Sequence, residues 1–254
     1  MPSHIILTAF GTTTRAQAAY GHLERHIAAR FPDHMIHWAY SSPTVRKRSA
    51  TGGAPRLSVR EIIDSLGAGC AVVVQSLHVL PGREFERVEE DLRRAGGQTA
   101  LGRPLLSTTA DLHRLADCLQ PLIAADPHDA VLVLGHGTAH PCRAAYSELA
   151  LILQRRHGPR LFLSTLEFPD TAPESIAAHI AAAGHRRVVV LPLLLVAGMH
   201  FYRDITGDAN HSWRQLLSAQ RIEMKIHDQG LAMLPGVADM FCDHIGSALP
   251  VRKA

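Results

Sequence analysis

Three side chains that can hold a divalent metal each follow a predicted strand in the second half of the chain. They are His136, Glu167 and His200. Two imidazoles and one carboxylate suit a divalent transition metal, and imidazoles also accept protons near neutral pH. Because open α/β sheets gather their ligands at the carboxyl ends of the strands, we expect the three side chains to form one site for metal and proton chemistry.

The stretch Val131–His140 positions the first of these histidines. Its four opening apolar residues are typical of a buried parallel strand, and a glycine on either side of His136 allows a sharp backbone turn. Pro141 suits the first position of a following helix. His140 is then either a partner of the site or a cap of that helix.

The two halves of the chain resemble each other in sequence. Residues 5–20 align with residues 131–146, where a Gly-Thr pair and an Ala-Ala-Tyr triplet coincide. Residues 72–87 likewise align with residues 188–203. The pattern indicates a duplicated domain with a pseudo-two-fold axis, and it predicts a cleft between the strand ends of the two halves.

The alignment places the two histidines in one half only. Phe10 occupies the position of His136, and Glu84 occupies the position of His200. The metal site is therefore expected in the second half, and the equivalent turns of the first half are expected to contact a substrate. The expected substrate-binding residues are Phe10, Gly11, Thr12, His78 and Glu84.

Strand and helix patterns alternate along the whole chain. This alternation predicts an α/β protein with two similar Rossmann-like halves, each a parallel sheet flanked by helices, and Asp126-Pro127 separates residues 1–126 from 127–254. Gly184 is expected to follow the end of a helix, and the polar stretch 41–55 is expected to be a loop. The expected strands span residues 4–10, 35–40, 71–75, 98–102, 131–134, 160–167, 187–195 and 221–227, and the expected helices span 15–30, 58–66, 83–95, 109–124, 142–156, 173–183, 207–219 and 234–249.

The composition is that of an ordinary globular protein. Of the 254 residues, 46% are hydrophobic and 19% are charged, and the net charge is +3. This mild charge does not indicate a nucleic-acid partner, but it suits an acidic small molecule. The four cysteines form no Cys-x-x-Cys pair, no apolar run reaches the length of a membrane span, and the first residues resemble a strand rather than a signal peptide. We therefore expect a cytoplasmic protein with free thiols and no membrane contact.

A dinucleotide site is the main alternative from the motifs alone. Gly135-His136-Gly137 after a strand, with Glu167 after the next one, matches half of the fingerprint of such sites. His140 stands where the third glycine is expected, however, and the acidic residue comes about 30 residues on rather than about 20. No phosphate-loop motif and no Gly-x-Ser-x-Gly elbow is present, so we expect no nucleotide cofactor.

Five short motifs are spread over nearly the whole chain. They are Ala9-Phe-Gly-Thr-Thr13, Gln75-Ser-Leu-His-Val-Leu-Pro-Gly82, Leu134-Gly-His-Gly-Thr138, Leu166-Glu-Phe-Pro169 and Leu195-Val-Ala-Gly-Met-His200. Together they resemble the anaerobic cobaltochelatases of the CbiK type, which belong to the class II tetrapyrrole chelatases and have the ferrochelatases as relatives.

The resemblance implies a lyase that inserts Co²⁺ into sirohydrochlorin in anaerobic cobalamin biosynthesis. It also implies that His136, Glu167 and His200 hold the metal, which is a substrate. Ligand types alone do not select Co²⁺ over Fe²⁺ or Ni²⁺. Insertion of Fe²⁺ for sirohaem and a non-catalytic haem or metal carrier are therefore the alternatives. The expected partners are the tetrapyrrole and a divalent metal, without nucleic acid, and a homo-oligomer is left open.

Overall fold

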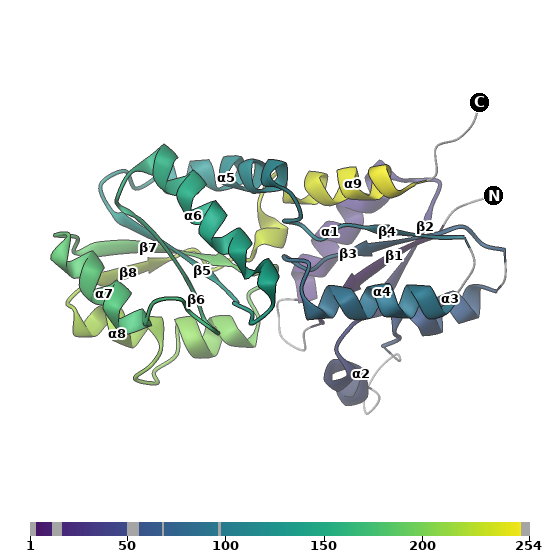
Figure 1. Ribbon diagram of the computed structural model, residues 1–254, viewed down its shortest axis with the longest axis horizontal. Coiled ribbons are helices and arrows are strands. Elements are labelled where there is room, and N and C mark those ends of the chain that lie inside the picture. Colours follow the sequence, from purple (N-terminus) through teal and green to yellow (C-terminus); the bar gives the residue numbers. More distant parts are fainter. Residues whose placement is uncertain (1–3, 12–16, 50–55, 68, 96–97, 250–254) are drawn as a thin grey trace. The chain divides into compact units, whose positions relative to one another are not determined.

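The computed structural model describes residues 4–11, 17–49, 56–67, 69–95 and 98–249. Strands and helices alternate along this chain, which divides into two compact units with one four-stranded parallel sheet each. Unit 1 comprises Met1–Ser107 and Gly236–Ala254, and unit 2 comprises Thr108–Pro235 (Figure 1). The predicted α/β class with two Rossmann-like sheets is confirmed.

Unit 1 is a parallel sheet with helices on both faces. Its described elements are β1 (His4–Ala9), α1 (Gln17–Arg30), β2 (Met35–Tyr40), α2 (Pro43–Ser49), α3 (Val59–Leu66), β3 (Val72–Ser76), α4 (Arg83–Ala95), β4 (Thr99–Gly102) and α9 (Val237–Ala248). The strand order is β2-β1-β3-β4. Apolar residues of α3 and α4 pack on one face, and α1 and α9 cover the other.

Unit 2 repeats this plan and carries the predicted metal ligands. Its described elements are α5 (Thr109–Ala124), β5 (Ala130–Gly135), η1 (Pro141–Arg143), α6 (Ala144–His157), β6 (Leu161–Thr165), α7 (Pro173–Ala182), β7 (Arg187–Leu193), η2 (Phe201–Ile205, a π-helical turn), α8 (Trp213–Ala219), β8 (Glu223–Ile226) and η3 (Leu231–Met233). The strand order is β6-β5-β7-β8. Trp213, Phe201 and Ile205 fill the core between β5, β7 and the helices α7 and α8.

The structure confirms the internal repeat. The two strand orders coincide when β5 to β8 replace β1 to β4, so the aligned strands β1 and β5 are both central. Each is followed by a glycine with positive φ, 98° at Gly11 and 88° at Gly137. A buried tyrosine, Tyr20 in unit 1 and Tyr146 in unit 2, hydrogen-bonds the backbone of that glycine. The repeat therefore includes the turns at the ends of the central strands.

Two helices, α5 and α9, do not belong to the unit that their position in the sequence suggests. α5 follows β4 in the chain but packs on α6 in unit 2, whereas α9 follows β8 but packs on β3, β4 and α1 in unit 1. The units thus differ from the consecutive halves 1–126 and 127–254 expected from the sequence. An apolar helix face shows that a helix packs on a core, but it does not show which sheet supplies that core.

The polar stretch 41–55 contains a helix, so the loop prediction is wrong for its first part. α2 begins at Pro43, and the Ser42 hydroxyl accepts a hydrogen bond of 3.4 Å from the backbone N–H of Val45. The Arg46 side chain donates to the Tyr40 carbonyl at 2.7 Å, which ties the helix to the end of β2. Residues 50–55 lie outside the described residues.

The region after β7 differs most from expectation. The helix predicted at 207–219 begins only at Trp213, where Ser212 accepts from the backbone N–H of Gln215 at 3.3 Å. The π-helical turn η2 precedes it and was not predicted. Gly184 does follow α7 with a φ of 87°, as expected. Among the described helices, none combines the length and apolar character needed to cross a membrane.

Candidate metal centre

Backbone hydrogen bonds join the turns that follow β5 and β6. The N–H of Leu166 donates to the carbonyl of Gly135 at 2.9 Å, and the N–H of Glu167 donates to the carbonyl of His136 at 2.8 Å. Gly137 lies against this contact with a φ of 88°, and a Cβ there would overlap the carbonyl oxygen of Glu167. The close approach that places His136 beside Glu167 therefore needs glycine at position 137.

The Glu167 carboxylate lies next to the His136 ring and is open to solvent. Its Oε2 is 4.0 Å from His136 Nδ1, and the two side chains are 46% and 44% exposed. Phe168 has a φ of 50°, a left-handed backbone conformation that bulky residues rarely adopt. The backbone therefore changes direction at the residue that follows Glu167.

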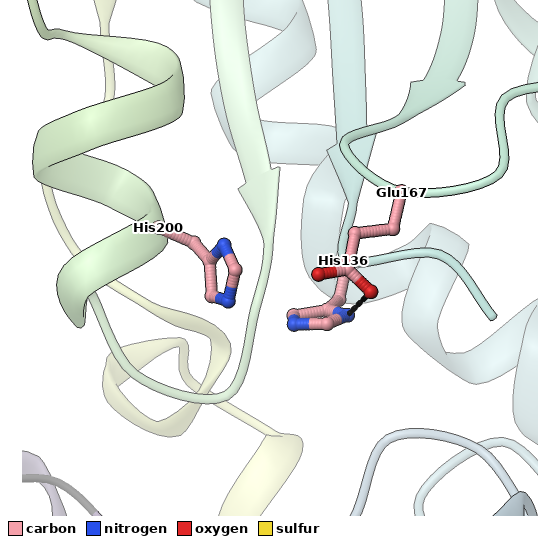
Figure 2. Close-up of side chains that lie close together, drawn as sticks. All are labelled: His136, Glu167 and His200. Carbon is pink, nitrogen blue, oxygen red and sulfur yellow. Dashed lines mark ion pairs between the residues drawn. The ribbon is translucent and has the colours of Figure 1, made fainter.

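His200 reaches the same place from the turn that precedes η2. The neighbouring Phe201 is buried in the core of unit 2 and anchors this turn. The His200 and His136 rings meet edge to face, with centroids 4.4 Å apart and planes at 79°. Figure 2 shows His136 and Glu167 after their strands and His200 on the adjacent helical segment.

The structure thus brings together the three residues that the sequence singled out. One ligand atom from each of His136, Glu167 and His200 lies within 4.8 Å of the other two. In the part of the chain that the structure describes, no other group of three histidine, cysteine or acidic residues meets this criterion. Two nitrogens and one oxygen at this separation can converge on a divalent transition metal after small side-chain movements.

Both histidines have a hydrogen-bond partner for Nδ1. His136 Nδ1 lies 3.1 Å from the carbonyl oxygen of Gly137, and His200 Nδ1 lies 2.7 Å from Oδ2 of Asp204. A carbonyl and a carboxylate only accept, so these two contacts need the hydrogen on Nδ1 of the neutral ring, and Arg203 Nη2 also lies 3.4 Å from His200 Nδ1. This tautomer leaves Nε2 of both rings for the metal.

Asp204 is a residue of this site that sequence analysis missed. Arg203 donates to its two oxygens at 2.6 and 2.9 Å, and this bonding lowers the pKa of the Asp204 carboxyl, which is therefore ionised. Its side chain is only 17% exposed, so it is fixed beside His200. The signal that could have found it is the spacing of four residues, which places two side chains on one helix face.

The residues expected to bind substrate lie in unit 1, apart from Thr12, which falls outside the described residues. Phe10 is 50% exposed, and Gly11 follows it in the turn after β1. His78 is held by two serine hydroxyls, Ser76 on Nδ1 at 2.9 Å and Ser41 on Nε2 at 3.1 Å. Burial lowers the pKa of His78 to about 4, so its ring is neutral near pH 7.

Two further candidates have local partners. Glu84 is in the first turn of α4 and pairs with Arg87 at 2.6 Å. The His140 ring accepts from the backbone N–H of Cys142 at 3.2 Å, so it caps η1, one of the two roles expected for it. The four cysteines form no disulfide, as expected.

The fold and the site define a class: an α/β protein of two repeated units, with a half-exposed His–Glu–His cluster at the carboxyl ends of the strands of one unit. The model of the cobalt chelatase (CbiK) family matches residues 3–250, and this chain belongs to that family. The resemblance noted in the sequence is thereby confirmed.

Two relatives match over most of their length. The sirohydrochlorin cobaltochelatase CbiKC of Nitratidesulfovibrio vulgaris is 31% identical over 255 residues, which cover 96% of this chain and 90% of that protein. The sirohydrochlorin cobaltochelatase of Salmonella typhimurium is 28% identical over 258 residues, which cover 98% of this chain and 97% of that protein.

Solved structures with the same fold include two proteins of low sequence identity. SirB from Bacillus subtilis with Fe³⁺ superposes with a TM-score of 0.66 at 14% identity, over 98% of this chain and 96% of that chain. CbiX, described as the terminal enzyme for biosynthesis of siroheme in denitrifying bacteria, has a TM-score of 0.59 at 16% identity, over 98% and 100% of the two chains. At this identity the likeness shows the fold alone.

Replacing Gly137 by Ala should weaken both folding and Co²⁺ binding, because the new Cβ overlaps the Glu167 carbonyl. We expect a loss of about 1–3 kcal/mol in unfolding free energy and at least roughly tenfold in Co²⁺ affinity. Urea unfolding and Co²⁺ titration measure these two quantities. Gly184→Ala is the matched control, because its φ is also positive, at 87°, but a Cβ there meets nothing within 4 Å. Equal Co²⁺ affinity in the two variants would contradict the account of this turn.

Replacing Asp204 by Ala should lower Co²⁺ affinity by roughly 10- to 100-fold, because the His200 ring loses the acceptor that orients it. Asp204→Asn retains an oxygen acceptor without the charge and should fall between Ala and wild type. Isothermal titration with Co²⁺ gives the affinities. Asp208→Asn, at a carboxylate that is 94% exposed, is the control and should bind like wild type. Unchanged affinity in Asp204→Ala would remove Asp204 from the site.

The lowered pKa of His78 predicts a pH dependence of stability. In the unfolded chain, His78 is exposed and has a pKa near 6.5, whereas in the folded chain its pKa is about 4. As the pH falls, the unfolded chain therefore binds a proton at His78 before the folded chain does. The contribution of His78 is therefore intact above about pH 6.5 and declines as the pH falls towards 4. Urea unfolding at pH 7.5 and 4.5 should show a smaller loss of stability for His78→Asn than for wild type. An identical loss would show that His78 titrates normally.

Proposed function

We propose that this chain inserts Co²⁺ into sirohydrochlorin, with His136, Glu167 and His200 holding the incoming metal. The observation that carries the proposal is the convergence of the three side chains within 4.8 Å at the strand ends of unit 2. Membership of the cobalt chelatase family supports Co²⁺ as the metal and the tetrapyrrole as its acceptor.

The donor set suits a metal that must leave again. Imidazole nitrogen is a good ligand for Co²⁺, and the carboxylate offsets part of its charge. A structural metal site is closed by four protein ligands, whereas three protein ligands leave a position open. His136 and Glu167 are 44% and 46% exposed, so a macrocycle can approach the metal from the solvent side.

Metal insertion must also dispose of two protons. One Co²⁺ replaces the two N–H hydrogens of the free macrocycle, so the reaction yields the cobalt complex and two H⁺. As Co²⁺ passes to the pyrrole nitrogens, Nε2 of each histidine loses its metal and becomes a proton acceptor at the reacting centre. The Asp204 carboxylate, 2.7 Å from His200 Nδ1, stabilises the imidazolium that forms when His200 takes a proton.

Three exposed apolar side chains adjoin the proposed ligands. Phe168 follows Glu167 and is 57% exposed, Met199 precedes His200 and is 55% exposed, and Tyr202 is 53% exposed. Apolar side chains left exposed beside a site are available to contact a ligand. A flat aromatic macrocycle seated on the metal would cover such groups, which supports a tetrapyrrole as the substrate.

The visible absorbance of sirohydrochlorin mixed with protein and Co²⁺ tests the proposal, with Fe²⁺ in a parallel series. Faster conversion with Co²⁺ than with Fe²⁺ is expected. His136→Ala and His200→Ala should each lower the enzymatic rate by at least about 100-fold, because each removes a ligand and a proton acceptor. Glu167→Gln keeps the oxygen but not the charge, and should lower the rate more than the Co²⁺ affinity.

His211→Ala is the matched control, because this histidine of unit 2 is exposed and lies outside the cluster. Its rate should equal that of wild type. Circular dichroism confirms that each variant is folded. Near-wild-type rates in both His136→Ala and His200→Ala would overturn the assignment of the metal centre. A shifted spectrum without turnover in the wild type would indicate a tetrapyrrole carrier instead.

A further inference from the structure

Unit 2 contains a cavity that adjoins the candidate metal centre. It has a volume of about 330 Å³ and is lined by α6, the end of β6 and the segment that follows β6. Gly137 and Phe168, which directly follow His136 and Glu167, are part of its wall. A molecule centred on the metal therefore has its edge close to this cavity.

A weak ion pair lies in the cavity wall. Arg143 Nη2 is 3.3 Å from Oδ1 of Asp170, and the two side chains are 52% and 64% exposed. Exposed pairs with a single contact contribute little to stability, because water solvates both charges. The Arg143 guanidinium can therefore exchange Asp170 for another carboxylate at small cost, and a guanidinium binds carboxylates in a bidentate manner.

Hydroxyl groups line the same cavity. Thr138 and Ser147 contribute two of them. Ser164 is only 5% exposed, and its Oγ has no hydrogen-bond partner among the described residues. A buried hydroxyl without a partner is costly, and a polar ligand group would satisfy it.

The backbone of β6 adds a further donor. β6 is at the edge of its sheet, and the carbonyl of Arg160 and the N–H of Leu166 both bond to the β5 side. Since alternate residues of a strand direct their backbone groups to opposite sides, the N–H of Thr165 faces the open edge. Thr165 is part of the cavity wall, so this N–H is placed to donate to an oxygen ligand.

We propose that this cavity binds a carboxylate arm of the tetrapyrrole substrate, with Arg143 exchanging Asp170 for that arm. The proposal rests on the function proposed above. Sirohydrochlorin is an octa-acid, so its rim carries carboxylates on every side when the ring is centred on the metal. Arg143 supplies the charge that selects a carboxylate, and Asp170 competes with the substrate for it.

The competition predicts effects of opposite sign for the two partners. Arg143→Gln should raise the Kd for metal-free sirohydrochlorin about tenfold, because a charge-assisted hydrogen bond is lost. Asp170→Asn should lower this Kd about two- to fivefold, because the guanidinium no longer has to leave a carboxylate. Titration of the metal-free macrocycle by its own absorbance and fluorescence gives Kd without turnover. Both effects should shrink at high salt.

Arg214→Gln and Asp208→Asn are matched controls, because they change the same charges at an exposed pair of unit 2 outside the cavity, 3.9 Å apart. Both should bind the macrocycle like wild type. Co²⁺ titration without macrocycle should give the same affinity in all variants, since no ligand of the metal is altered. Equal thermal midpoints show that the fold is unaffected.

The outcomes separate the cavity from the proposed function. Opposite shifts in Arg143→Gln and Asp170→Asn, with unchanged controls, support the arm site. If the wild type binds and converts sirohydrochlorin but both variants match their controls, the arm site alone is wrong. Weaker binding in both variants would show that the ion pair is only structural, and this also overturns the arm site. A wild type that binds no sirohydrochlorin overturns both proposals.

Discussion

The backbone contact between the turns after β5 and β6 is the constraint on which the candidate metal centre depends. The hydrogen bond of 2.8 Å from the Glu167 N–H to the His136 carbonyl joins the two turns just beyond the ends of the strands. It fixes an imidazole and a carboxylate side by side without using their side chains, and it requires that position 137 has no Cβ. The buried β5–β6 pair holds this contact, so the core of unit 2 determines the geometry of its reactive edge.

The two histidines are oriented by different hydrogen-bond acceptors, and this difference bears on the proposed transfer of the metal to the macrocycle. A neutral carbonyl accepts from His136, whereas an ionised carboxylate, itself held by Arg203, accepts from His200. A carboxylate raises the basicity of its imidazole more than a carbonyl does. Under the proposed function, the Asp204 carboxylate therefore orients the His200 ring while the metal is bound and stabilises the imidazolium that forms after the metal leaves. In the proposed function, the three donors bind and release the metal, and the histidines take up the protons.

Most of the fold and all three proposed ligands could be predicted from the sequence. Apolar runs such as Val188–Val190 indicate buried strands, and the glycines around His136 indicate the turn that follows a strand. Both signals lie in a few consecutive residues, so the sequence alone reveals them. The packing of α5 in unit 2 and of α9 in unit 1 could not be predicted, because an amphipathic pattern does not show which sheet a helix packs on. Asp204 was missed because a π-helical turn of five residues has too little periodicity to reveal a helix. Arg143 was missed because its role depends on a cavity formed by segments distant in sequence.

Anomalous diffraction at the cobalt absorption edge, from crystals of the protein loaded with Co²⁺ alone, is the most direct test of the metal centre. A single strong peak is expected within bonding distance of Nε2 of His136, Nε2 of His200 and a carboxylate oxygen of Glu167, with Asp204 on the other nitrogen of the His200 ring. A peak bound to other residues, or one bound to a single histidine with the other ring turned away, would contradict this expectation.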